Sequence, residues 1–147
     1  MSRDRSLALA RVALSLVVAV ALVLAATGCG RLDRDSVSTE LKTLESSTGE
    51  GMLVAQEAAR SRAAADFIEI RTAELSKQSA DAAETLDGTP TESGLQRAAG
   101  RGSEIGNRAS EILDELHGNP GDESLAKKVV LELDSLHDEA GRLQESL

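Results

Sequence analysis

The sequence has almost no aromatic residues, since Phe67 is the only one and tryptophan and tyrosine are absent. Ligand pockets and protein-interaction hot spots rely heavily on aromatic side chains. Their scarcity argues against a site that stacks sugars or drug-like molecules. Prolines are also few, strand-favouring runs are missing, and the strong helix formers alanine, leucine, glutamate and arginine dominate the C-terminal four-fifths of the chain. The composition therefore predicts an all-α protein.

Cysteine is nearly absent as well, and the single one, Cys29, follows a segment of distinctive composition. Three arginines accompany the start of an apolar run, residues 12–26, in which one serine is the only polar residue. Thr27 and Gly28 are small and lead directly to the cysteine. Because this run is shorter than the ~20 residues of a membrane-spanning helix, it is typical of a secretory signal peptide. An uncleaved signal anchor is the alternative interpretation.

Gly28 and Cys29 resemble the lipobox of bacterial lipoproteins, in which the signal peptide is cut directly before a cysteine. Ala26 departs from the leucine that is usual two positions before the glycine. The resemblance covers only residues 1–30, and it implies that the signal peptide 1–28 is removed by cleavage between Gly28 and Cys29. It also implies that Cys29 carries acyl chains such as palmitate. Since two or more acyl chains anchor a protein stably, we expect a lipid-anchored protein on the extracytoplasmic face of the cell membrane.

The chain that follows the expected cleavage site is strongly acidic. The first 28 residues hold three arginines and one aspartate, so the rest holds 13 basic and 24 acidic residues, a net charge of −11. Nucleic acid binding needs a basic surface, so we expect no nucleic acid partner. The same charge opposes adhesion to anionic lipids. Membrane attachment therefore has to come from the acyl chains on Cys29.

Hydrophobic spacing predicts a tether at 29–35 and a single helical domain over 36–147. Apolar and small residues alternate at three- and four-residue intervals in three long segments, which is typical of antiparallel helices in a bundle. The predicted helices are a short one at about 36–47 and a three-helix bundle at about 52–86, 90–117 and 120–146. The residues that repeat at these intervals form a stripe along each helix, which we call its seam. The seam of the first long helix is rich in small residues, which allow a neighbouring helix to approach closely. Such seams pair between chains as well as within one, so self-association stays open.

Glycines mark the places where helices are expected to weaken. Gly49 and Gly51 lie close together, and this spacing predicts a break, kink or hinge between the short helix and the first long one. A continuous helix through these positions is the alternative. Gly100, Gly102 and Gly106 predict fraying or a bend in the second long helix, because each glycine costs up to ~1 kcal/mol relative to alanine.

Two similar connections, residues 88–92 and 118–122, separate the three long segments. Each begins with a glycine suited to ending a helix. Thr89 or Asn119 follows as a candidate N-cap, and a proline then stands at the expected first helical position. These patterns predict two short turns between antiparallel helices.

No residue pattern indicates catalysis. His117 and His137 are the only histidines, and they should lie about 24 Å apart along a helical hairpin, too far to share a metal. Neighbouring acidic residues are best interpreted as solvated helix surfaces. No phosphate-binding, nucleophile-elbow, zinc or calcium-loop motif is present in the sequence. We therefore expect no enzyme activity, no cofactor and no metal.

The leading hypothesis is a non-catalytic envelope accessory, adaptor or spacer that acts by contact with an envelope protein or with a second copy. The alternative is a small-ligand binding or sensing module on the cell surface. That alternative predicts an apolar pocket between helices, lined by Phe67, Ile68, Ile70 and Leu75.

Overall fold

Four long helices make up most of the part of the chain that the computed structural model describes, residues 31–147. The helices are α2 (Arg34–Ala59), α3 (Ala65–Leu86), α4 (Leu95–His117) and α5 (Glu123–Glu145). Two very short strands, β1 (Arg31–Leu32) and β2 (Thr89–Pro90), pair in parallel. The predicted all-α class is therefore confirmed.

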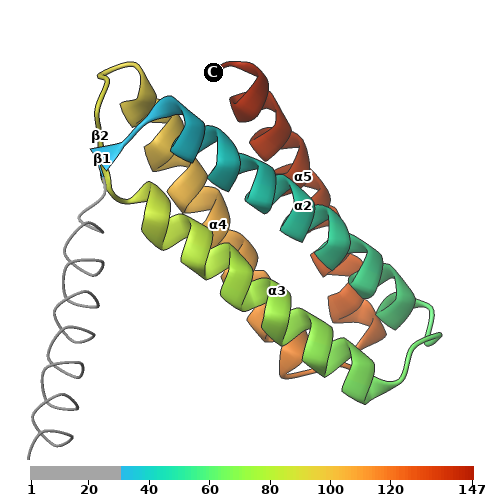
Figure 1. The fold of residues 1–147 in the computed structure, drawn as a ribbon. Coiled ribbons are helices and arrows are strands. Elements are labelled where there is room, and N and C mark those ends of the chain that lie inside the picture. Colours follow the sequence, from blue (N-terminus) through green and yellow to red (C-terminus); the bar gives the residue numbers. More distant parts are fainter. Residues whose placement is uncertain (1–30) are drawn as a thin grey trace, which may run out of the picture. The chain divides into compact units, whose positions relative to one another are not determined.

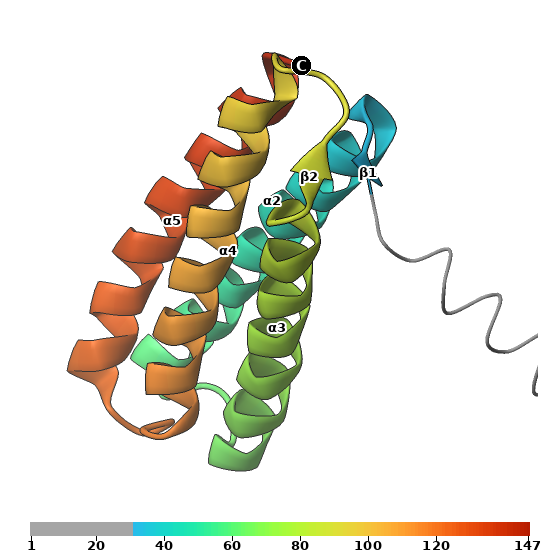
Figure 2. The same ribbon diagram turned by 90° about the vertical axis from the view of Figure 1, so that its left-hand side faces the viewer.

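The helices form an antiparallel bundle in which α2 packs against α3 and α5, and α4 packs against the same two helices (Figures 1 and 2). The start of α2 meets the end of the chain, because Arg34 donates a hydrogen bond to the carbonyl oxygen of Leu147. The other end of α2 meets the start of α5, where the Ser61 hydroxyl donates to Glu123 at 2.7 Å. The predicted count of three bundle helices is wrong, because the first helix is a full fourth member.

The predicted break at Gly49–Gly51 is also wrong, because α2 runs through both positions without interruption. A Cβ atom on Gly51 would lie 3.0 Å from side-chain atoms of both Leu113 and Leu133, and one on Gly49 would lie 3.2 Å from the ring of His137. The glycines thus make room for neighbouring helices. Tertiary packing offsets their unfavourable helix propensity.

The continuous helix predicted at 52–86 is instead two helices joined by a turn at residues 60–64. Ser61 adopts a left-handed conformation with φ of 50°, and its backbone N–H donates to the carbonyl of Ala58. Folding back at this point lets Val54 of α2 pack in the same core cluster as Ile68 of α3. Without the turn, the apolar seam would extend beyond the shorter helices that cover it.

Helices α3 and α4 approach each other closely through small residues, as the small residues in the seam of the helix predicted at 52–86 indicate. A Cβ atom on Gly106 would lie 2.7 Å from the backbone oxygen of Ser79 and 2.8 Å from the Cβ of Ala83. Gly102 is buried too, with Leu86 and Leu41 side chains against it. The expected bend at 100–106 does not interrupt α4, which is helical from Leu95 to His117.

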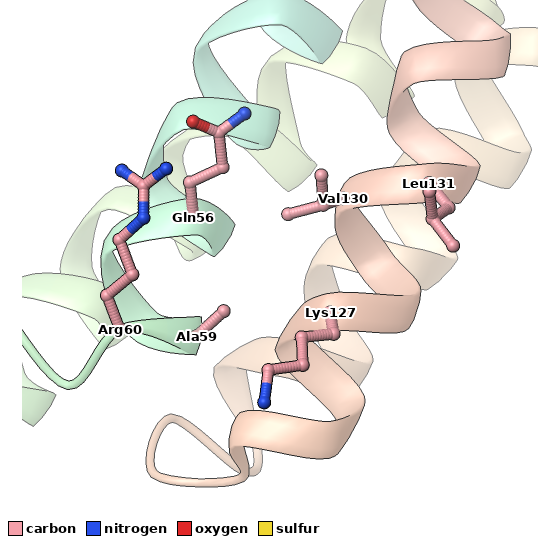
Figure 3. Close-up of a pocket in the computed structure, with 6 residues that line it drawn as sticks. All are labelled: Gln56, Ala59, Arg60, Lys127, Val130 and Leu131. Atoms are coloured by element: carbon pink, nitrogen blue, oxygen red, sulfur yellow. The ribbon is translucent and has the colours of Figure 1, made fainter.

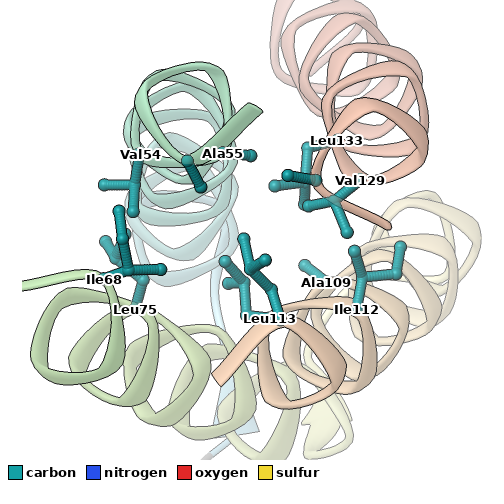
Figure 4. Close-up of a cluster of buried hydrophobic side chains, with 12 residues drawn as sticks. Val54, Ala55, Ile68, Leu75, Ala109, Ile112, Leu113, Val129 and Leu133 are labelled. Atoms are coloured by element: carbon teal, nitrogen blue, oxygen red, sulfur yellow. The ribbon is translucent and has the colours of Figure 1, made fainter. Parts of the chain in front are cut away.

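Two apolar clusters fill the bundle, one toward each end. The cluster near the 60–64 turn draws side chains from all four helices (Figure 4). Its members are Val54, Ala55, Ala58, Ile68, Leu75, Ala109, Ile112, Leu113, Leu116, Ala126, Val129 and Leu133. The second cluster includes Leu32, Leu41 and Leu86 and lies toward the end that carries β1 and β2. Burying these side chains is the main stabilising contribution to the bundle.

Both connections differ from the predicted capped turns. Thr89 and Pro90 form β2 beside β1, so α4 begins only at Leu95 and lacks a side-chain N-cap. Helix α5 is capped by Asp122 rather than Asn119, since the Asp122 carboxylate accepts from two backbone N–H groups at 2.9 Å. The strand pair also orders part of the segment predicted as a tether, in which Leu32 is buried.

Candidate functional site

The predicted lipidation and cleavage residues, Cys29 and Gly28, lie outside the described residues. The residues that the structure describes begin at Arg31, which pairs with Thr89. Among residues 31–147, no helix is long and apolar enough to cross a membrane.

The two histidines bind carbonyl groups on different helices. The Nδ1 atom of His117 lies 3.0 Å from the carbonyl oxygen of Glu69 in α3. The Nδ1 atom of His137 lies 2.8 Å from that of Glu45 in α2. His117 is exposed, whereas His137 is half-buried at the α2–α5 contact. Both rings therefore serve helix–helix contacts.

The described part of the chain contains no group of three or more histidine, cysteine, aspartate or glutamate side chains placed to hold a metal. The adjacent acids Asp114 and Glu115 are exposed, in agreement with a solvated surface. Partial burial raises the pKa of Glu40, whereas hydrogen bonds from Ser36 lower the pKa of Asp33, the N-cap of α2. These shifts have structural causes and do not mark an acid–base pair.

A layer of buried and half-buried hydroxyl groups crosses the middle of the bundle. The hydroxyls of Ser47 and Ser79 lie 3.0 Å apart between α2 and α3, and those of Ser76 and Ser110 lie 2.9 Å apart between α3 and α4. Within residues 31–147, every buried side-chain nitrogen or oxygen has a hydrogen-bond partner. The layer is thus internally satisfied, and it offers no free polar group to a ligand.

The pocket predicted around Phe67, Ile68, Ile70 and Leu75 does not form. Ile68 and Leu75 are buried in the core, with 1% and 2% of their surfaces exposed, whereas Phe67 and Ile70 point outward and are about half exposed. The helical period separates these residues onto two faces of α3. They therefore divide between the core and the solvent instead of enclosing a ligand.

A groove is present instead between the end of α2 and the start of α5, with a volume of about 390 Å³. Its lining residues are Gln56, Ala59, Arg60, Lys127, Val130 and Leu131 (Figure 3). Val130 is half-buried and Leu131 is 72% exposed, so the groove is open to solvent. The lining is mainly apolar, with one amide and two cationic side chains.

Sequence reasoning missed this groove because its two walls are about 70 positions apart in the chain. Arg60 and Lys127 each look like an ordinary surface cation on an amphipathic helix. Val130 and Leu131 are the local signal, because both stand outside the apolar seam of their helix. An off-seam leucine shows that a helix has a second apolar face but does not identify the element beside it.

Comparisons with protein-family models, with curated proteins and with solved structures find no match for this chain.

Proposed function

We propose that the chain is a lipid-anchored protein of the extracytoplasmic face of a bacterial cell membrane, where its helical bundle serves as a non-catalytic accessory, adaptor or spacer. The observation that carries this proposal is the position of Cys29, directly after an arginine-containing start, a short apolar run and small residues. Acyl chains on this cysteine would supply the membrane affinity that the acidic chain lacks.

The start of the bundle bears on how such an anchor would act. Only one residue separates Cys29 from Arg31, and a fully extended chain spans at most ~3.6 Å per residue. Lipid on Cys29 would therefore hold the β1–β2 end of the bundle within roughly 10 Å of the anchored atom. A short tether of this kind favours an accessory that acts close to the membrane surface.

The test is metabolic labelling of bacteria that express the full chain with an alkyne-tagged palmitate, followed by fractionation and mass measurement. The wild type is expected to carry label, lack residues 1–28 and sediment with membranes. Cys29→Ser is expected to carry no label and to keep the precursor mass. Thr27→Ser is the matched control, because it keeps a small residue beside an intact cysteine. Equal labelling of the wild type and Cys29→Ser would refute the anchor.

A partner is sought separately, by photo-crosslinking from two exposed apolar positions on different helices, Ile70 of α3 and Leu131 of α5. An adaptor is expected to crosslink one discrete envelope protein, or a second copy, from one of these positions and not from the other. A spacer is expected to give no discrete product from either.

The α2–α5 groove favours a second candidate function, the binding of a small ligand. Its volume of about 390 Å³ falls within the usual range for ligand sites, roughly 300–1,000 Å³. The groove replaces the pocket expected on α3 and keeps the ligand-binding hypothesis open on a different surface.

A further inference from the structure

The α2–α5 groove combines an apolar lining with a local excess of positive charge. Ala59, Val130 and Leu131 supply the apolar surface, and Arg60 and Lys127 stand on opposite walls (Figure 3). The described chain around them has a net charge of −11, from 13 basic and 24 acidic residues. The two cations that line the groove therefore contrast in sign with the net charge of the described residues.

Several other cations of the described chain are neutralised by carboxylates of neighbouring turns or helices. Arg101 pairs with both Glu104 and Glu139, for example. Similar pairs are made by Arg71, Lys77, Arg108 and Lys128. Within residues 31–147, Lys127 makes no ion pair, and Arg60 makes one contact of 3.6 Å with Glu57 of its own helix. The charge at the groove is thus available to an anion.

We propose that this groove binds a long-chain fatty acid, with the alkyl chain lying along Val130 and Leu131 and the carboxylate attracted to the cationic side chains of its two walls, Arg60 and Lys127. A carboxylate complements two cations, and Gln56 adds an amide that can donate to the same head group. An alkyl chain needs only apolar contact, which Ala59, Val130 and Leu131 provide without an aromatic side chain. A flat ring or a sugar would lack a stacking partner here.

The proposal gives a ligand class to the ligand-binding role named above as the second candidate, and it does not depend on lipidation of Cys29. The groove lies near the end of α2, about 26 residues past its start at Arg34, which is roughly 39 Å along the helix. A fatty acid bound here is therefore distinct from acyl chains attached at Cys29.

The experiment uses the full chain in nanodiscs of neutral phosphatidylcholine, labelled with a photoactivatable palmitic acid or with its methyl ester. Both probes have the same alkyl chain, so simple partition into lipid gives equal labelling. We expect the acid to label peptides that contain residues 56–60 and 127–131 about fivefold more than the ester. Ion pairs on an exposed surface are weak, so contacts of the carboxylate with these cations raise the affinity for the acid only by about this factor.

Two double variants test the role of the cations. Arg60→Gln with Lys127→Gln is expected to abolish the preference for the acid. Lys42→Gln with Arg97→Gln removes the same charge from exposed cations outside the groove and is expected to keep the preference. All four side chains are exposed, so circular dichroism should show a full helical signal for both variants.

Three results would overturn the proposal. Equal labelling of the groove peptides by acid and ester would remove the carboxylate specificity while leaving an apolar ligand site. An absence of labelling in these peptides would remove the ligand-binding role altogether. Loss of the preference in the Lys42/Arg97 variant would show that overall charge, and not the groove, selects the acid. None of these results bears on the lipid anchor at Cys29, which labelling of the Cys29→Ser variant tests independently.

Discussion

Two glycines six residues apart in α4 should respond in opposite directions to the same substitution. An alanine Cβ at Gly106 would lie 2.7 Å from the backbone oxygen of Ser79 and 2.8 Å from the Cβ of Ala83. At Gly100, which is exposed, the same atom would meet nothing within 4 Å. The pair therefore separates the helix propensity of alanine from the cost of displacing a neighbouring helix.

The expected magnitudes follow from these distances. Gly100→Ala should stabilise the protein by up to ~1 kcal/mol, because alanine favours the helix and loses less backbone entropy on folding. Gly106→Ala gains the same propensity but forces α3 and α4 apart, and overpacking of this kind typically costs about 1–3 kcal/mol. Backbone of α3 cannot move aside as a flexible side chain can, so we expect a cost near the upper end and a net loss of about 1–2 kcal/mol.

The assay is urea unfolding of residues 31–147 followed by far-ultraviolet circular dichroism, since the chain has no tryptophan or tyrosine for fluorescence. The two variants should differ by about 2–3 kcal/mol in free energy of unfolding. Their melting temperatures should differ by roughly 10 °C, with Gly100→Ala above the wild type and Gly106→Ala below it. A Gly106→Ala variant as stable as Gly100→Ala would refute the close packing of α3 on α4.

Three further predictions concern buried space, the hydroxyl layer and acid pH. Gly51→Ala should destabilise the protein less than Gly106→Ala, because the atoms that obstruct a Cβ at Gly51 are leucine methyl groups that can shift. Urea unfolding of both variants measures the difference. Ser47→Ala and Ser79→Ala should each cost ~1 kcal/mol, and a double-mutant cycle should show that the double change costs less than their sum, since both remove one shared hydrogen bond. Hydrogen bonds from Ser36 lower the folded-state pKa of Asp33 below its ordinary value of 3.8. The stability that this carboxylate contributes is therefore present above pH 3.8, and it is lost as the pH falls through the folded-state pKa. Asp33→Asn accepts the same bonds without titrating, so its unfolding curves at descending pH should lack this loss.

The sequence by itself determined the class of the fold and most of the buried faces. Ile105, Ala109, Ile112 and Leu116 stand at alternating four- and three-residue intervals, and all four are buried. The ends of α3 and α4 also fall where glycines 88 and 118 predict them, within two residues. These features are local consequences of a helix that repeats every 3.6 residues and must bury one face, so a single segment carries them.

Only the tertiary structure decided the number of helices and the place where the chain turns. The connection at 60–64 contains neither glycine nor proline, and Ser61 adopts positive φ there without a local signal. Conversely, Gly49 and Gly51 predict a break that packing against His137, Leu113 and Leu133 removes. The free energies that fix a turn or keep a helix whole come from contacts with distant segments, and a periodic pattern does not specify those contacts.

Tertiary packing also explains why the pocket predicted on α3 does not form. The sequence draws attention to Phe67 and Ile70 as apolar residues of α3, but the structure leaves them on an outer surface. The groove arises because α5 returns antiparallel beside α2 and brings Lys127 opposite Arg60. The groups that lie opposite a surface cation belong to the helix packed beside it, and the local sequence does not identify that helix. The sequence therefore determined the side chains available, and the packing of α2 against α5 decided which of them line one groove.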